Sequence, residues 1–219
     1  MRIQDAYSRW SSTYDSDRNL TRDLDRLATE RTLLGRRYQN ILELGCGTGK
    51  NTRLLDRIGR KVVALDFSPG MLREAKTKVR ADHVLFVRAD LEKQWPTKTA
   101  SFELVVCNLV LEHIEDLNPV FSQASRALMS GGHFFVSELH PSRQYQGIQA
   151  NFRTEQETVE IEAFVHHLSD FTEAARENGL SLEIIKEWWH EEDRNKLPRL
   201  ISFLFQNRRK LSSATASSL

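Results

Sequence analysis

Residues 43–50, ELGCGTGK, follow a short apolar run and begin an amphipathic segment. The glycines at 45, 47 and 49 let the backbone turn sharply between a strand and a helix, where a ligand can lie against bare main chain. A tight turn without a ligand is a poor explanation, because three alternating glycines weaken folding through their chain entropy. The stretch therefore predicts a ligand-binding turn.

The glycine spacing distinguishes this turn from the nicotinamide-dinucleotide fingerprint, which reads G-x-G-x-x-G/A. Lys50 stands where that fingerprint has its last glycine or alanine. A long charged side chain there would disturb the close packing of helix on strand that the dinucleotide pattern needs. The dinucleotide interpretation is therefore disfavoured.

Around this turn, strand-like and helix-like runs alternate, which predicts parallel strands joined by helical crossovers. The link between the last two strands is too short for a helical crossover, so this pair is expected to be antiparallel. The predicted fold class is α/β, a Rossmann-like, doubly wound, mostly parallel seven-stranded sheet with an antiparallel last strand. The expected strands are 40–44, 61–66, 83–87, 102–109, 133–139, 182–188 and 200–206, and the expected crossover helices are 51–58, 69–79, 118–131 and 169–179, with Ser68 and Ser169 as caps of the second and fourth.

Two segments fall outside this alternation. Residues 1–38 are interpreted as an N-terminal helical lid, helical over 5–38. Residues 140–168 are too long for an ordinary connection, which marks them as a functional insertion near the acceptor pocket. A single domain, residues 1–210, accounts for the chain, and the small polar residues 211–219 are expected to form a disordered tail.

Composition argues against nucleic-acid and membrane partners. The 31 lysines and arginines nearly balance the 30 aspartates and glutamates, and a net charge of +1 gives no general attraction to phosphate backbones or acidic membranes. The N-terminus is too polar for a signal peptide, and no apolar run approaches a membrane span. Cys46 and Cys107 lack metal-ligand spacing, which suits a reducing compartment, so the expected localisation is cytoplasmic.

Four motifs, in order along the chain, carry a resemblance to a known family. They are the glycine turn, Asp66 at the end of the second strand, Asp90 within RADLEKQWP (88–96), and FELVVCNLVLEHIED (102–116). From Asn40 to about Gln206 the chain resembles a class I S-adenosylmethionine-dependent methyltransferase of the small-molecule type. The resemblance implies that S-adenosyl-L-methionine is the cofactor.

The resemblance also gives the motif residues their roles. The glycine turn would wrap the amino-acid part of the cofactor, and Asp66 would bind both ribose hydroxyls. An ionised carboxylate can accept two hydrogen bonds from a vicinal diol, which supports the second role independently. Phe67 would lie against the adenine ring, Asp90 would accept its amino group, and Asn108 would lie beside the sulfonium. The implied cofactor-binding residues are Glu43, Gly45, Cys46, Gly47, Gly49, Asp66, Phe67, Asp90, Leu91 and Asn108.

Departures from related patterns narrow the chemistry. Asn108 stands in NLVL, whereas the amino-methylating DNA and RNA enzymes have an Asn/Asp-Pro-Pro-aromatic tetrad there. Catechol-type relatives need a metal-binding aspartate near this edge, so metal dependence is disfavoured and no metal site is expected. Cys107 lacks the Pro-Cys or Thr-Cys setting of the cytosine-methylating nucleophiles and is assigned to the sheet core.

His113, in LEHIED, is the candidate catalytic residue. A neutral imidazole near the methyl donor could take the substrate proton at neutral pH. Relatives of many specificities carry a similar Leu-Glu-His run, so a structural or cofactor-pocket role stays open.

The acceptor pocket is expected between the lid and the insertion, which usually build it in this family. Because adjacent His166 and His167 point different ways on any regular element, at most one of them is expected to face a ligand. The candidate substrate-binding residues are Tyr7, Tyr14, His140, Gln144, Tyr145 and His166.

The predicted function is transfer of a methyl group from S-adenosylmethionine to an oxygen or nitrogen of a small molecule by direct in-line displacement. One alternative is an RNA or protein acceptor, because the same cofactor core serves these enzymes too. Another is a non-catalytic subunit with this fold that serves a partner. Near-neutral charge counts against RNA, and intact Glu43, Asp66 and Asp90 count against loss of the cofactor.

Overall fold

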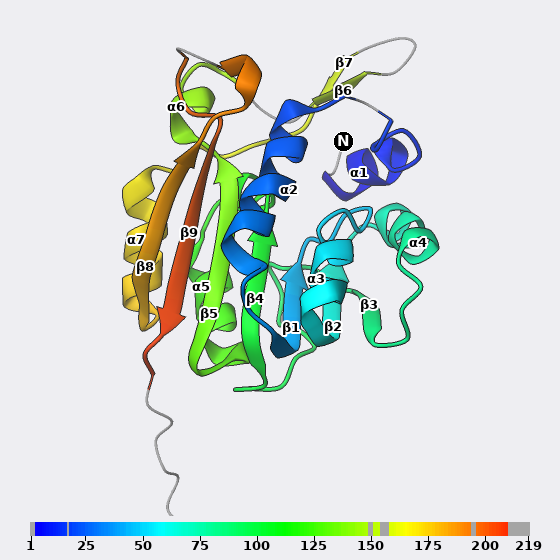
Figure 1. Ribbon diagram of the computed structural model, residues 1–219. Coiled ribbons are helices and arrows are strands. Elements are labelled where there is room, and N and C mark those ends of the chain that lie inside the picture. Colours follow the sequence, from blue (N-terminus) through cyan, green and yellow to red (C-terminus); the bar gives the residue numbers. More distant parts are fainter. Residues whose placement is uncertain (1–2, 17, 149–150, 154–157, 194–195, 210–219) are drawn as a thin grey trace, which may run out of the picture.

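The computed structural model describes residues 3–16, 18–148, 151–153, 158–193 and 196–209. Within them, seven strands form one mixed sheet in the order β3-β2-β1-β4-β5-β9-β8 (Figure 1). β9 runs antiparallel to β5 and β8, and the four other neighbouring pairs are parallel. The strands are β1 (Tyr38–Leu44), β2 (Gly59–Asp66), β3 (Val84–Arg88), β4 (Phe102–Asn108), β5 (Leu128–Leu139), β8 (Leu180–Trp188) and β9 (Leu200–Asn207). The predicted Rossmann-like sheet with an antiparallel strand near its end is confirmed.

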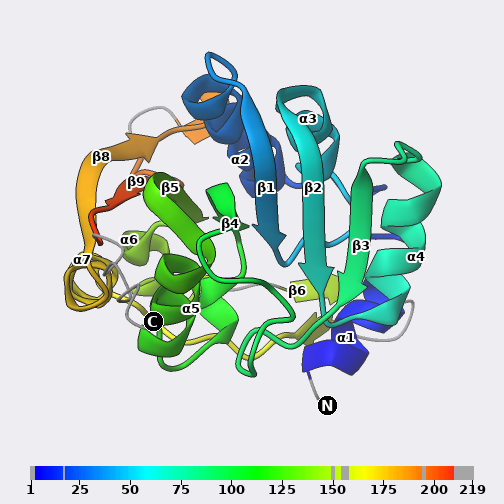
Figure 2. The same ribbon diagram turned by 90° about the horizontal axis from the view of Figure 1, so that it is seen from below.

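Helices cover both faces of this sheet, as the doubly wound prediction requires. α2 (Leu20–Leu33) and α3 (Thr52–Ile58) lie on one face, and α5 (Asn118–Ala127) and α7 (Leu168–Glu177) lie on the other (Figure 2). Fully buried Phe121, Phe134 and Phe205 pack between the sheet and α5. Leu55 and Ile58 of α3 pack on the opposite face. The central strands β1, β4 and β9 are thus mostly buried on both sides, which explains their nearly continuous apolar sequence.

Local chemistry sets where two of the crossover helices begin. Ser68 caps α4 (Pro69–Lys78), as predicted, because its hydroxyl accepts the N–H of Met71 at 3.2 Å. The prediction that Ser169 caps α7 is wrong. The carboxylate of Asp170 accepts the N–H of His167 at 2.7 Å, so His167 is the cap residue and the helix begins at Leu168.

The expected helical stretch over 5–38 is two helices rather than one. α1 (Ile3–Trp10) ends in a turn over residues 11–16, and α2 begins again after Asn19. The side-chain oxygen of Asn19 accepts the N–H groups of Thr21 and Arg22, which starts a new helix in a new direction. Figure 1 shows α1 beside α4, whereas α2 lies along the sheet over β5 and β9.

The helix predicted over 118–131 is longer than the observed one. α5 ends at Ala127, and β5 begins at Leu128 rather than at 133. The pairing of β4 with β5 skips from Leu128 to His133, so the intervening residues bulge out of the ladder.

The insertion at 140–168 forms a short helix, α6 (Pro141–Gln144), and a two-stranded hairpin, β6 (Asn151–Arg153) with β7 (Thr158–Glu160). Ile161, just after β7, packs with Ala6 and Trp10 of α1. The insertion and the lid therefore meet beyond the carboxyl ends of the parallel strands. Residues 211–219, predicted as a tail, lie outside the described residues.

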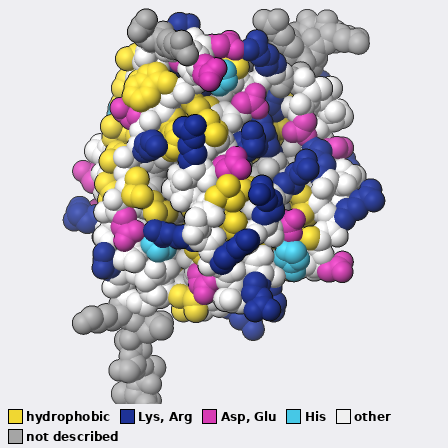
Figure 3. Space-filling view, in the orientation of Figure 1, with side chains coloured by type: hydrophobic (Ala, Val, Ile, Leu, Met, Phe, Trp, Pro, Cys, Tyr) yellow, Lys and Arg dark blue, Asp and Glu magenta, His cyan; other side chains and the backbone are white. Residues whose placement is uncertain are grey.

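Acidic and basic side chains are interspersed over the face seen in Figure 3. In the part of the chain that the structure describes, no helix has both the length and the apolar character needed to cross a membrane.

Replacing Phe134 by alanine should lower the free energy of unfolding by about 3–5 kcal/mol, because it opens a cavity between the sheet and α5. Leu85→Thr on β3 is the control, since Leu85 is 59% exposed; this change should stay within about 0.5 kcal/mol. Denaturant unfolding measures both. Equal effects would contradict the assignment of the core.

Candidate functional site

A cavity of about 510 Å³ lies at the carboxyl ends of β1, β2 and β4, where residues of α1 and α2 close over it. Its size is that of a small-molecule site. Of the residues singled out from the sequence, it is lined by Glu43, Gly45, Cys46, Gly47, Asp66, Phe67, Asp90, Leu91, Asn108, His113, Tyr7 and Tyr14. Gly49 is not among the lining residues, because it turns the chain toward α3 and packs against Ala75.

The glycine turn needs glycine for two different reasons. Gly45 has φ +65°, and a Cβ there would lie 2.3 Å from a methyl carbon of Val110. Gly47 has φ +52°, and a Cβ there would meet nothing within 4 Å. Packing against Val110 leaves no space for a side chain at Gly45. Gly47 faces open space, so its backbone is accessible to a ligand.

Two backbone N–H groups, one in the glycine turn after β1 and one after β2, hold the carboxylate of Asp66 in place. Its Oδ2 accepts the N–H of Gly47 and its Oδ1 accepts the N–H of Ser68, both at 2.8 Å. Burial raises the pKa of Asp66 to about 6, although these two bonds favour the charged form. Each oxygen keeps a further lone pair, which a ribose diol could use.

Two other carboxylates lie on either side of Asp66 along the cavity. Burial raises the pKa of Glu43 to about 8, and the Thr52 hydroxyl donates to its Oε2 at 2.6 Å. Asp90 follows β3 and lies 3.2 Å from the ammonium nitrogen of Lys93. The two acids therefore differ in environment. Glu43 is buried in the glycine turn, whereas the side chain of Asp90 is partly exposed to solvent at the edge of the cavity.

A polar cluster at the end of β4 was not expected from the sequence. Asn108 donates through Nδ2 to Asp25 at 2.7 Å and to Thr29 at 2.9 Å. Asn51, which ends the glycine turn, donates to the other oxygen of Asp25 at 2.8 Å. Burial raises the pKa of Asp25, against the hydrogen bonds from both amides.

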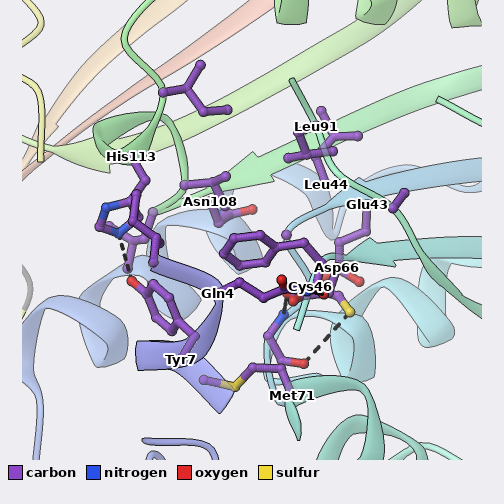
Figure 4. Close-up of a pocket in the computed structure, with 18 of the residues that line it drawn as sticks. Gln4, Tyr7, Glu43, Leu44, Cys46, Asp66, Met71, Leu91, Asn108 and His113 are labelled. Carbon is purple, nitrogen blue, oxygen red and sulfur yellow. Dashed lines mark hydrogen bonds between the residues drawn. The ribbon is translucent and has the colours of Figure 1, made fainter. Parts of the chain in front are cut away.

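Tyr7 and His113 form a hydrogen-bonded pair in the wall of the cavity. The Tyr7 hydroxyl lies 2.7 Å from Nε2 of His113, and Nδ1 lies 2.8 Å from the carbonyl oxygen of Glu162. Because a carbonyl only accepts, Nδ1 carries the hydrogen and Nε2 accepts from Tyr7. Burial lowers the pKa of His113 and raises that of Tyr7, so both groups are neutral near pH 7. Figure 4 shows the pair on one side of the cavity.

The four insertion residues predicted to bind substrate do not line this cavity. Buried His166 lies with Nε2 3.0 Å from the carbonyl of Leu111 and 2.8 Å from that of Ile114. His140 begins α6 and bonds to Glu187, and Gln144 donates to the carbonyl of Phe164. Tyr145 is 60% exposed and bonds to His167. These side chains hold the insertion together.

Sequence reasoning missed three cavity residues with strong roles in the geometry: Arg22, Asp25 and Asn51. The only signal for the first two was their spacing of three, which puts both on one face of a helix. Nothing local marked Asn51. Among the described residues, no group of three or more His, Cys, Asp or Glu is placed to hold a metal ion.

Comparison with known proteins identifies the domain. A family model described as a methyltransferase domain matches residues 42–136. A structure of a putative S-adenosylmethionine-dependent methyltransferase from Listeria monocytogenes superimposes with a TM-score of 0.73 at 18% identity, covering 84% of this chain and 99% of that chain. Residues 42–136 therefore match a methyltransferase domain, and the chain has the fold of an S-adenosylmethionine-dependent methyltransferase.

Further solved structures carry the same methyltransferase fold. The N-methyltransferase NodS from Bradyrhizobium japonicum WM9, in complex with S-adenosyl-l-homocysteine, matches with a TM-score of 0.74 at 16% identity, over 95% of this chain and all of that chain. That neighbour and a second one, the DhpI–SAH complex, hold S-adenosyl-l-homocysteine or SAH, which relates to the predicted cofactor, S-adenosyl-L-methionine. The cavity fits such a group through its open glycine backbone, its buried diol acceptor and its polar cluster.

Two curated relatives of this methyltransferase domain are O-methyltransferases. Malonyl-[acyl-carrier protein] O-methyltransferase of Serratia marcescens is 33% identical over 140 residues, which is 63% of this chain and 52% of that protein. Ubiquinone biosynthesis O-methyltransferase of Xanthomonas oryzae pv. oryzae (strain PXO99A) is 28% identical over 184 residues, 79% of this chain and 74% of that protein. The chain spans about half or less of the length of the first curated relatives it matches.

The Tyr7–His113 geometry predicts a neutral imidazole with hydrogen on Nδ1. Nitrogen-15 NMR should show less than half of His113 protonated at the ordinary histidine pKa of about 6.5. Tyr7→Phe should shift the Nε2 resonance, because that nitrogen loses its donor. Tyr145→Phe, which alters the separate Tyr145–His167 pair, should leave His113 unchanged. An imidazolium at that pH would contradict the assignment.

Proposed function

We propose that this chain is an enzyme that transfers a methyl group from S-adenosyl-L-methionine to an oxygen or nitrogen of a small molecule by direct in-line displacement. One observation carries the proposal: a single cavity holds the cofactor acids at one end and the Tyr7–His113 pair at the other. In Figure 4, Asn108 lies between His113 on one side and Asp66 and Glu43 on the other. That arrangement leaves room for a donor and an acceptor in line.

The bound cofactor would supply a methyl group on a sulfonium, which departs as a neutral thioether. The protein's task is then to align the acceptor and exclude water, which can lower the barrier by roughly 7–11 kcal/mol. Asp66 and Asp90 would hold the nucleoside from successive strand ends. Tyr7 and Gln4 would close the cavity, since Gln4 of α1 donates to the carbonyl of Phe67 at 2.6 Å.

The acceptor's proton would leave through Tyr7. The Tyr7 hydroxyl already donates to His113 Nε2, so its oxygen is free to accept the acceptor's hydrogen bond as its own proton passes to the imidazole. Tyr7 would thus touch the acceptor and His113 would act through it. A hydroxyl acceptor gains most from this relay, because a neutral amine needs no base before attack. The two O-methyltransferase relatives agree with that preference.

Metal independence, cellular location and the class of acceptor each have one supporting feature. Metal independence follows from Asn108 standing where metal-dependent relatives carry an aspartate. A cytoplasmic location is supported by two buried free thiols, Cys46 and Cys107. A nucleic-acid acceptor is disfavoured by the balanced charge.

Methyl-labelled S-adenosylmethionine and a cell extract fractionated by size test the acceptor class. The labelled methyl group should appear in the small-molecule fraction, and its amount should increase with the amount of this protein added. Label recovered only in RNA or in bulk protein would replace the small-molecule proposal with the alternative acceptor. Cofactor binding without any label transfer would favour the non-catalytic subunit.

Asp66→Ala should weaken binding of S-adenosylhomocysteine by more than roughly 1.5 kcal/mol, the scale of hydrogen bonds to a charged group. Calorimetry measures the dissociation constant. Asp82→Ala, at an exposed turn before β3, is the matched control and should bind like the unaltered protein. An unchanged constant in Asp66→Ala would refute the ribose assignment.

His113→Ala and Tyr7→Phe should each reduce turnover by roughly 10²- to 10⁴-fold, because either change breaks the proton path. Cofactor affinity should change little in His113→Ala and in Tyr7→Phe, since the latter keeps the ring that lies 6.4 Å from that of Phe67. Single-turnover rates with the acceptor found above measure the effect. Turnover that survives both changes would remove the pair from the mechanism.

A further inference from the structure

Glu112 is a buried acid beside His113, outside the lining of the cavity. It belongs to the short 3-10 helix η1 (Leu111–His113), which follows β4. The residue is 7% exposed and is not among those that line the cavity, whereas His113 is. Glu112 can therefore act on a ligand only through its neighbour.

Backbone contacts from two directions fix the position of Glu112. The N–H groups of Val110 and Leu111 donate to Oε1 of Glu138, at 3.0 and 2.9 Å, which ties η1 to the end of β5. The carbonyl oxygen of Glu112 accepts the N–H of Phe164 at 2.7 Å, which ties η1 to the insertion. The Glu112 carboxylate is therefore buried at a fixed place in the fold.

This carboxylate faces the nitrogen of His113 that would receive a proton. Its Oε1 lies 3.8 Å from Nε2 of His113, and both side chains are less than a tenth exposed. Its Oε2 has no hydrogen-bond partner among the described residues, and within them His113 is the only ion-pair partner of Glu112. A buried carboxylate with so few partners gains free energy when a positive charge forms beside it.

The other neighbours of the imidazole provide no opposite charge. Nδ1 of His113 donates to the carbonyl oxygen of Glu162 at 2.8 Å, and a carbonyl has no net charge. The Tyr7 hydroxyl, 2.7 Å from Nε2, is neutral because burial raises its pKa. An imidazolium at this place would depend on Glu112, because an opposite charge within about 4–6 Å favours the charged form.

The titratable groups that act on one another here are Tyr7 of α1, Glu112 and His113 of η1, and Glu138 of β5. Burial raises the pKa values of Tyr7 and Glu138 well above the ordinary ones, so both stay protonated near pH 7. Burial raises the pKa of Glu112 to about 7 and lowers the pKa of His113. As the pH falls, the first proton therefore goes to Glu112, and His113 is protonated at lower pH.

We propose that Glu112 is a positioning residue for methyl transfer, whose carboxylate stabilises the imidazolium that forms on His113 when the acceptor's proton passes through Tyr7. This inference rests on the proposed function. The acceptor's O–H proton moves to the Tyr7 oxygen as the Tyr7 proton moves to Nε2. The acceptor oxygen forms its bond to the methyl carbon, and the bond from that carbon to sulfur breaks with its electron pair left on sulfur. Only ionised Glu112 can act in this way.

Nitrogen-15 NMR of His113 tests the pair without any methyl transfer. In the unaltered protein, the Nε2 resonance should move in two steps as the pH falls. The first step is expected near pH 7, when Glu112 gains a proton, and the second below the ordinary histidine pKa of about 6.5. Glu112→Gln should remove the first step and keep the second. Glu115→Gln, at an exposed acid of the same segment, is the matched control and should keep both.

Single-turnover methylation of the acceptor identified by labelling measures the effect on the reaction. In the unaltered protein the rate should rise with pH through about 7, as Glu112 loses its proton. In Glu112→Gln the rise should move below about 6.5, because only His113 remains to titrate. The plateau should fall by roughly 10-fold or more, since a nearby opposite charge shifts a pKa by about 1–3 units. Glu115→Gln should match the unaltered protein.

Calorimetry with S-adenosylhomocysteine reports whether the variants still fold, and the dissociation constant should be the same in all three proteins. Loss of binding in Glu112→Gln would overturn the proposal by showing a structural role. A first NMR step, or a rise in rate near pH 7, that survives in Glu112→Gln would overturn it as well. An unaltered protein that shows both NMR steps but transfers no methyl group would refute the proposed function, and with it the role of Glu112, while leaving the coupled pair established.

Discussion

The carboxylate of Asp66 is the group on which the site depends. Its oxygens accept the N–H groups of Gly47 and Ser68, so one side chain ties the turn after β1 to the beginning of α4. The parallel register that pairs Leu44 with Leu65 brings the two segments together. Burial without a cation is unfavourable, as the raised pKa of about 6 shows.

Helices α1 and α2 of the N-terminal segment supply residues that close the cavity at the end of the sheet. α1 brings Tyr7 to His113, and α2 brings Arg22 and Asp25 to the cavity. Close approach of α1 depends on Gly70, where a Cβ would lie 2.9 Å from the carbonyl oxygen of Ser8. The two helices therefore supply different polar side chains to one cavity, although the sequence shows one polar segment before the first strand.

Local signals predicted the cofactor end because backbone geometry demands particular residues there. Gly45 and Gly47 have positive φ, and Ser68 with Pro69 starts a helix in almost any context. The insertion carried no such constraint. His166 was a reasonable ligand candidate by chemistry, yet packing directs it to the carbonyls of Leu111 and Ile114. Histidine as a structural bridge and histidine as a ligand have the same sequence signature.

The order of the strands, the glycine turn and the acids at successive strand ends were predictable from the amino-acid sequence, because each follows from spacing along neighbouring residues. Which side chains face one another across the cavity depends on the packing of distant segments. Tyr7 meets His113 over a separation of 106 residues, and Asp25 meets Asn108 over 83. Contacts at such separations are set by how the lid helices dock on the sheet, through packing that no local pattern encodes.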